Sequence, residues 1–175
     1  IIQDNYFKPH PSVVRDLLRE IPFTDTIITD NKDIAFVANK CGKLSLALSI
    51  DNPKKQHDII IIPSVNNNLK IIAEYLKVCK YKVAVLLPLS FLTGTQRHKS
   101  IFSKLPLSEV LIYIEDVNIE RNEDIKGVEP LSFDNYAWYI FERSYNGEPH
   151  LKWIHNDKSL IFVNGDTSHT TVLNG

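Results

Sequence analysis

The sequence has little of several features that would narrow its class at once. It contains two cysteines, six glycines and no methionine, and its formal charge is −1 over 175 residues. The two cysteines, Cys41 and Cys79, fit neither a disulfide framework nor a CxxC metal site, so we expect reduced, packed thiols in a cytoplasmic protein. A net charge near zero gives no overall attraction to polyanions, so nucleic-acid binding requires a local basic patch.

Long apolar runs are also missing. No run reaches the length of about 18 apolar residues that a membrane-spanning helix needs, and no basic segment precedes a shorter apolar one as in a signal peptide. The sequence therefore predicts no membrane contact. Asparagine, isoleucine and lysine are frequent, a usage typical of AT-rich genomes, including viral ones.

What the sequence does contain is an alternation of short apolar runs and amphipathic segments. Four consecutive isoleucines at 59–62 and the apolar run 83–87 are typical of strands that are buried on both faces. The segment 67–79 between them has apolar residues at helical spacing. A strand, a helix and a second strand in this order predict two adjacent, parallel, buried strands.

The same alternation predicts the remaining elements. Helices are expected at 12–20, 34–41, 67–79 and 96–104, and strands at 25–30, 44–50, 59–62, 82–87 and 109–114. Two aromatic strands follow at 136–141 and 151–154, with the hairpin signal Asn146-Gly147 between them. This order predicts an α/β, Rossmann-like fold with a mainly parallel sheet and an antiparallel C-terminal hairpin at its edge. Residues 1–155 are expected to form this domain, and residues 156–175 a C-terminal extension.

Four stretches carry a resemblance to a known family. They are Asp4-Asn5-Tyr6-Phe7-Lys8-Pro9, His57 to Pro63, Val83 to Leu92 with Gln96-Arg97 and Ile101-Phe102, and Asn135 to Phe141 with Leu151 to Ile154. In order along residues 4–155 they resemble the aromatic-x-Pro entry, the catalytic strand, the strand with its following short helix, and the closing hairpin of phage and bacterial DNA adenine methyltransferases. The resemblance implies a methyltransferase fold with S-adenosylmethionine as the cofactor.

The catalytic motif that the resemblance implies is degenerate. The family places Asn/Asp-Pro-Pro-Tyr/Phe after the catalytic strand, because the reaction on an exocyclic amine needs acceptors for the amine protons and a ring stacked on the flipped base. Here the stretch reads Ile62-Pro63-Ser64-Val65-Asn66. Pro63, Ser64 and Asn66 hold the motif positions, but no acid or amide precedes the proline and no ring follows it. The sequence therefore favours a binding protein over an enzyme.

The cofactor site that the resemblance implies is also incomplete. A glycine-rich turn after the first strand lets the backbone approach the ligand, yet no glycine occurs between Ile1 and Lys40. Asp30 and Asp33 lie in that turn. Asp51, at the end of the second strand, is placed to bind ribose hydroxyls, although an aspartate that opens an Asp-Asn-Pro turn also explains it. We expect S-adenosylmethionine to bind weakly or not at all through Asp30, Asp33 and Asp51.

One local basic cluster remains a candidate for nucleic-acid contact. Gln96, Arg97, Lys99 and Lys104 are suited to phosphate contacts, and also fit a solvated helix face. The six histidines lack HExxH or His-x-His spacing, so no metal site is predicted.

Two hypotheses follow from these observations. The first is a degenerate methyltransferase-fold protein that binds a nucleic acid, an active methyltransferase subunit or a second copy of itself. The alternative is an active S-adenosylmethionine-dependent DNA or RNA methyltransferase with a divergent pocket formed by Asp30, Asp51, Ser64 and Asn66.

Overall fold

The computed structural model describes residues 7–47, 56–63, 70–117, 119–121, 135–162 and 170–172. Its centre is a seven-stranded sheet made of β2 (Thr26–Thr29), β3 (Leu44–Ala47), β4 (Asp58–Ile61), β5 (Lys82–Pro88), β6 (Leu107–Tyr113), β8 (Tyr136–Glu142) and β9 (His150–Ile154). The strand order is β3-β2-β4-β5-β8-β6-β9. All of these strands are parallel except β8, which is antiparallel to both of its neighbours. The predicted α/β class with a mainly parallel sheet is confirmed.

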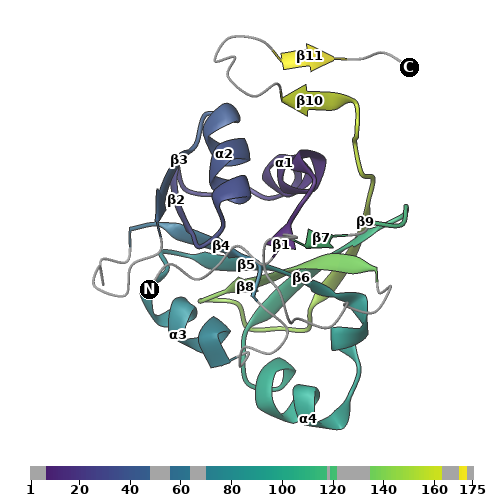
Figure 1. Ribbon diagram of the computed structural model, residues 1–175. Helices are drawn as coiled ribbons and strands as arrows, with labels where there is room; N and C mark the ends of the chain where they lie inside the picture. The colour runs from purple at the N-terminus through teal and green to yellow at the C-terminus, as the bar shows by residue number, and fades with distance from the viewer. Residues whose placement is uncertain are drawn as a thin grey trace.

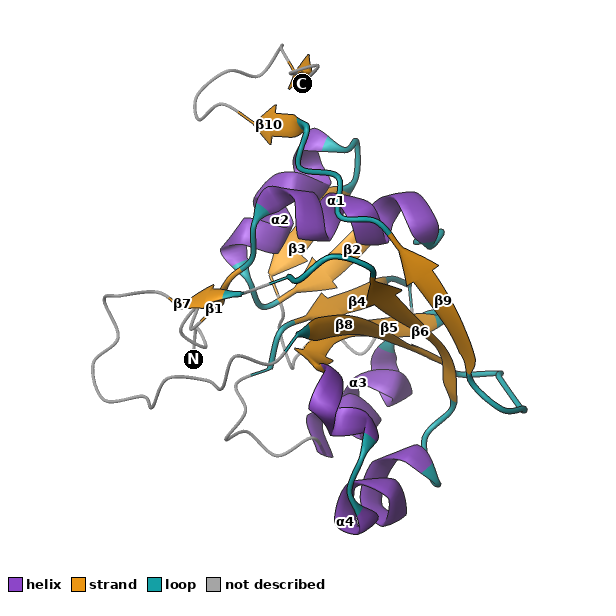
Figure 2. Cartoon of the chain, turned by 90° about the vertical axis from the view of Figure 1, so that its right-hand side faces the viewer, coloured by secondary structure: helices purple, strands orange, loops and turns teal. Residues whose placement is uncertain are grey.

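Helices cover both faces of the sheet (Figures 1 and 2). On one face lie α1 (Pro11–Glu20) and α2 (Lys32–Lys40); on the other lie α3 (Lys70–Val78), the 3₁₀ turn η1 (Leu89–Leu92), α4 (Thr95–Arg97) and the π-helical turn η2 (His98–Phe102). Alternate residues of each strand supply the two cores, so Ile60 and Trp138 pack on the α1 side, whereas Ile61 and Tyr139 pack on the α3 side.

The isoleucine strand and the next apolar run form the buried centre of the sheet. Ile59 pairs with Val83 and Ile61 with Val85 in parallel register. Ile59, Ile60 and Ile61 are fully buried, because each face of β4 is covered by a helical layer. The prediction of two adjacent, buried, parallel strands is therefore confirmed.

The two aromatic strands differ from the prediction. They do not pair with each other as a simple hairpin would require, because β6 lies between β8 and β9. β8 is an internal strand whose residues Tyr136 to Phe141 are all buried, whereas four of the five residues of β9 are exposed at the edge. Alternate residues of β8 enter the cores on the two faces of the sheet, so its apolar run is explained by the helical layers that cover both faces.

Two small strand pairs lie outside the main sheet and were not predicted. β1 (Phe7–Lys8) pairs with β7 (Glu120–Arg121), and β10 (Leu160–Phe162) pairs with β11 (Thr170–Val172). The division of the chain at residue 155 stays a prediction. No helix in the described part of the chain is long and apolar enough to cross a membrane.

Candidate functional site

Among the first four strands of the sheet, the order reverses between β2 and β4. The chain passes from β2 outward to β3, and then returns to place β4 on the other side of β2. In open α/β sheets, ligands bind beyond the carboxyl ends of the strands at such a switch point. The residues there are Asp30, directly after β2, and Ile62-Pro63, directly after β4. The sequence had placed a cofactor residue and the degenerate catalytic motif at these two positions.

Asp30 is a half-buried residue with an unusual carboxylate. Its Oδ1 is buried and has no hydrogen-bond partner among the described residues. Burial raises the pKa of Asp30 from its ordinary 3.8 to about 6, although the backbone N–H of Ile62 donates to the carboxylate and opposes this shift. Burial, together with the negative charge of Asp30, raises the pKa of Tyr75 in α3 to about 12. The switch point therefore holds a carboxyl group that titrates close to neutral pH.

Asn31, the next residue, closes the turn between β2 and α2. Its Oδ1 accepts hydrogen bonds from the backbone N–H groups of Asp33, at 2.9 Å, and Ile34, at 3.1 Å. Its Nδ2 donates to the backbone carbonyl of Phe7 at 2.9 Å. The N–H groups at the start of α2, which anionic ligands use in other α/β proteins, are thus engaged by a buried side chain of the chain itself.

The other predicted site residues divide between described and undescribed segments. Pro63 is buried beside the switch point. Asp33 lies in the first turn of α2, where its negative charge interacts favourably with the positive end of the helix dipole. Ser64, Asn66 and Asp51 lie outside the described residues. Asp30 and Pro63 follow the adjacent parallel strands β2 and β4 at the same end of the sheet, whereas Asp33 lies in the first turn of α2.

A pocket of about 480 Å³ lies beside the start of α1 and the ends of β6 and β9. Its lining is both apolar and charged: Lys8, Pro9, His10, Pro11, Val13, Asp116, Val117, Glu120, Asn156 and Lys158. The sequence reasoning missed this pocket because its residues come from distant segments. The hairpin-like Asn146-Gly147 signal and the aromatic-x-Pro entry gave no indication that these segments meet.

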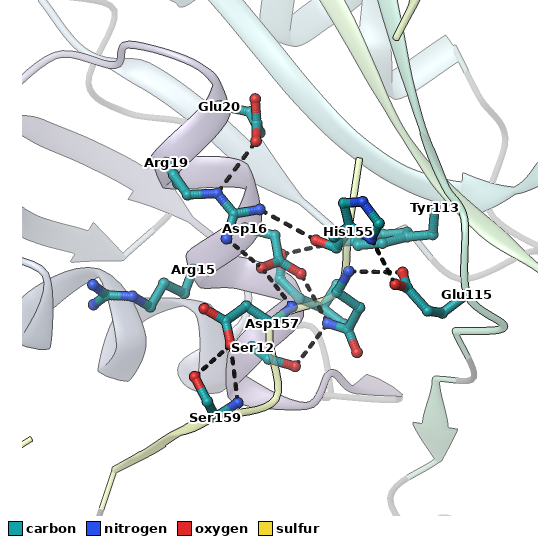
Figure 3. Close-up of polar contacts among 12 residues, drawn as sticks. Ser12, Arg15, Asp16, Arg19, Glu20, Tyr113, Glu115, His155, Asp157 and Ser159 are labelled. Carbon is teal, nitrogen blue, oxygen red and sulfur yellow. Dashed lines mark hydrogen bonds and ion pairs between the residues drawn. The ribbon is translucent and has the colours of Figure 1, made fainter. Parts of the chain in front are cut away.

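A buried polar network supports one wall of this pocket (Figure 3). Asp16 of α1 is fully buried and accepts hydrogen bonds from Asn156 Nδ2, at 2.8 Å, and from the backbone N–H of Asp157, at 3.2 Å. Asn156 Nδ2 also donates to Ser12 Oγ at 2.9 Å, and Arg19 Nη1 lies 3.2 Å from Asp16 Oδ1. Burial raises the pKa of Asp16 despite these partners. The network fixes the segment after β9 against α1.

One member of the predicted basic cluster, Arg97, is engaged within its own loop. Arg97 Nη1 donates to the carbonyls of Ser90 and Thr93, both at 3.0 Å, and its guanidinium lies 4.4 Å from the centre of the Phe91 ring. Arg97 therefore holds the loop after β5. Gln96, Lys99 and Lys104 are exposed, and Lys104 lies shortly before β6. Nucleic-acid contact by these residues stays a prediction.

No group of three or more His, Cys, Asp or Glu side chains within the described ranges is arranged to hold a metal ion. Neither Cys41 nor Cys79 forms a disulfide among the residues that the structure describes, and Cys79 is buried.

Comparison with known proteins gives little further guidance. No family model matches the chain, and no curated protein matches it. Among solved structures, the chain is similar to a predicted O-methyltransferase from Agrobacterium tumefaciens, with 8% sequence identity and a TM-score of 0.36 over 83% of this chain and 72% of that chain. A likeness of this size carries no argument about function, so the fold class rests on the sheet topology itself.

Proposed function

We propose that this chain is a methyltransferase-fold protein that does not transfer methyl groups and acts by binding a nucleic acid or an active methyltransferase subunit. The order of its segments, which resembles the DNA adenine methyltransferases, supports the fold. The mainly parallel sheet with a switch point between β2 and β4 agrees with it. Because such sheets host many activities, the choice of function depends on the side chains at the switch point.

The observation that carries the proposal is the closed turn after β2. Asn31 engages the first N–H groups of α2 and also Phe7, so a ligand must break buried hydrogen bonds before it can use this helix start. Each such bond contributes about 1 kcal/mol to stability. Together with the absence of glycine before Lys40, this geometry does not fit S-adenosylmethionine, and no catalytic step is derived through it.

The remaining cofactor contact is too weak by itself. A micromolar dissociation constant corresponds to about −8 kcal/mol, whereas one hydrogen bond to a charged group such as Asp51 contributes roughly 1.5–3 kcal/mol. We therefore expect S-adenosylmethionine to bind more weakly than about millimolar.

One observation favours the alternative, an active methyltransferase with a divergent pocket. The buried Oδ1 of Asp30, which has no hydrogen-bond partner in the described part of the chain, is a ready acceptor for a ligand donor at the switch point. In that case Asp30, Asp51, Ser64 and Asn66 would carry cofactor and base recognition.

Calorimetric titration with S-adenosylmethionine separates the two functions. We expect no heat of binding up to millimolar ligand. A micromolar dissociation constant that is lost in Asp51→Ala or Asp30→Asn would refute the proposal. Binding without methyl transfer to DNA or RNA would instead locate the defect at Pro63 to Asn66 and make the chain a cofactor-binding pseudoenzyme.

Polarisation of labelled DNA and RNA tests the nucleic-acid partner. We expect Lys99→Glu to weaken binding and to reduce the salt dependence by about one phosphate contact, because Lys99 is exposed and free to reach a backbone phosphate. Arg97 is left unchanged, since it holds its own loop. The matched control is Lys77→Glu, an exposed lysine of α3. If Lys99→Glu leaves binding intact, the surface around Lys99 does not contact the nucleic acid. If neither DNA nor RNA binds, the active methyltransferase subunit is left as the proposed partner.

A further inference from the structure

The edge strand β9 exposes large apolar side chains. Within the described chain it pairs only with β6, and its other side is open in Figure 2. Leu151 is 54% exposed, Trp153 62% and the nearby Ile114 57%. Leu151 pairs with Val110 and Trp153 with Ile112, so both lie on the sheet face that carries the α3-side core.

The backbone of β9 is also open at these positions. The N–H of Ile114 donates to the carbonyl of Ile154 at 2.9 Å, so the polar groups of Ile154 point toward β6. Successive residues of a strand direct their N–H and C=O groups to opposite sides. Leu151 and Trp153 therefore direct theirs away from the sheet, where a further strand can pair with them.

The charge at the centre of the strand is already neutralised. Lys152 points to the other face, and its Nζ lies 2.9 Å from Glu20 Oε2 of α1. Edge strands are commonly protected by free lysines, prolines or bulges. In β9 the one lysine is paired with Glu20, and the proline at this edge, Pro149, precedes the strand, so neither blocks pairing at Leu151 and Trp153.

We propose that two copies of this chain associate through β9, as an antiparallel strand pair centred on Lys152. In this register Leu151 of each copy lies opposite the partner's Trp153, and both pairs fall at positions whose N–H and C=O groups point outward. Each aliphatic–aromatic pair buries side chains that are otherwise exposed, and such cross-strand pairs stabilise sheets. The proposal commits to a second copy because this register forms the Leu151–Trp153 pair twice, once on each side of Lys152, and because each Lys152 is paired with Glu20 of its own copy.

The proposal is independent of the function proposed above, and its first test is the oligomeric state. We expect light scattering after gel filtration to show a concentration-dependent dimer. Trp153→Lys and Leu151→Lys should each weaken dimerisation at least about tenfold, since either substitution places a charged side chain opposite an apolar side chain of the partner. The control is Leu44→Lys, at 59% exposure on the opposite edge strand β3, which should leave the dimer intact. A monomer up to about millimolar concentration, or a dimer insensitive to Trp153→Lys, would overturn the proposal.

A second test reads the register directly. In the proposed pair, Lys152 lies opposite the partner's Lys152 at a position without hydrogen bonds, where Cα atoms are about 4.5 Å apart. This distance suits a disulfide. We expect Lys152→Cys to form a covalent dimer on mild oxidation, whereas His150→Cys and the unchanged chain do not. Cross-linking by His150→Cys and not by Lys152→Cys would overturn the register. This test decides the matter if a lysine variant fails to fold, as checked by circular dichroism.

Discussion

Two aspartates at opposite ends of the sheet differ in the hydrogen bonds that their carboxylates accept. Asp58, the first residue of β4, is 1% exposed; its Oδ1 accepts hydrogen bonds from the N–H groups of Tyr81 and Lys82, both at 3.0 Å, and its Oδ2 accepts from Thr24 at 3.2 Å. Asp30, beyond the end of β2, keeps one buried oxygen without a partner among the described residues.

The difference indicates that the amino end of the sheet serves stability, whereas the carboxyl end is available for ligand binding. At the amino end, a carboxylate with hydrogen-bond partners on both oxygens ties the segments that lead into β2 and β5 to β4. At the carboxyl end, where ligands of open α/β sheets bind, a carboxylate is left with unused capacity. Native structures satisfy most buried polar groups, so an unsatisfied one at a switch point marks a position kept for something other than packing.

The largest expected effect is at the amino end. Asp58→Ala should lower the free energy of unfolding by about 3 kcal/mol or more, because it leaves buried N–H donors without an acceptor. Urea denaturation measures the loss. Asp58→Asn, which keeps one acceptor, should lose less. Equal stability of Asp58→Ala and the unchanged chain would show that the carboxylate has no such role.

The second effect has the opposite sign. The pKa of Asp30 is raised from 3.8 to about 6, so between about pH 4 and 6 the folded state binds more protons than the unfolded state and stability falls as pH rises. Asp30→Asn should therefore be more stable than the unchanged chain at pH 8, by up to about 3 kcal/mol, since one pKa unit corresponds to about 1.4 kcal/mol. Near pH 4 the two should be nearly equal. A constant difference between the two proteins over this pH range would contradict the shifted pKa.

The smallest of the three effects is at Asn31. Asn31→Ala should cost about 1–2 kcal/mol, because the cap of α2 is removed and the carbonyl of Phe7 loses its donor. Asn31→Ser keeps a capping oxygen and loses the donor to Phe7, so it should cost less; thermal denaturation of both variants measures the two parts. The comparison fails if Asn31→Ser is the less stable of the two.

Much of the fold follows from short-range pattern. Continuous apolar runs predicted β4 and β5, because strands that are buried on both faces are apolar at every position. Apolar residues at helical spacing predicted α3, because a helix that is buried on one face is apolar only every three to four residues. The first βα turn was also predicted, and Asp30 with it. Pattern cannot rank strands in a sheet, so the position of β8 between β5 and β6 was not predicted.

The site residues that were missed depend on contacts between distant segments. Asn156 contacts Ser12 and Asp16, and no local pattern around any of the three indicates it. Arg97 was predicted as a phosphate ligand from its charge alone, whereas the Phe91 ring and two carbonyls engage it in the fold. Charge shows what a side chain is able to bind, and tertiary structure determines what it meets first.

The internal position of β8 has a consequence for biosynthesis. Because β8 separates β5 from β6, both earlier in the chain, neither hydrophobic layer can close until residue 142 has left the ribosome. Trp138 and Tyr139, two of the largest fully buried side chains, enter opposite layers at that moment. Until then the nascent chain presents the unpaired sides of two apolar strands, which are the surfaces that holding chaperones bind. A ribosome stalled before Tyr136 should therefore carry a chain that is protease-sensitive throughout, and one stalled well after Glu142 a chain with a protected core.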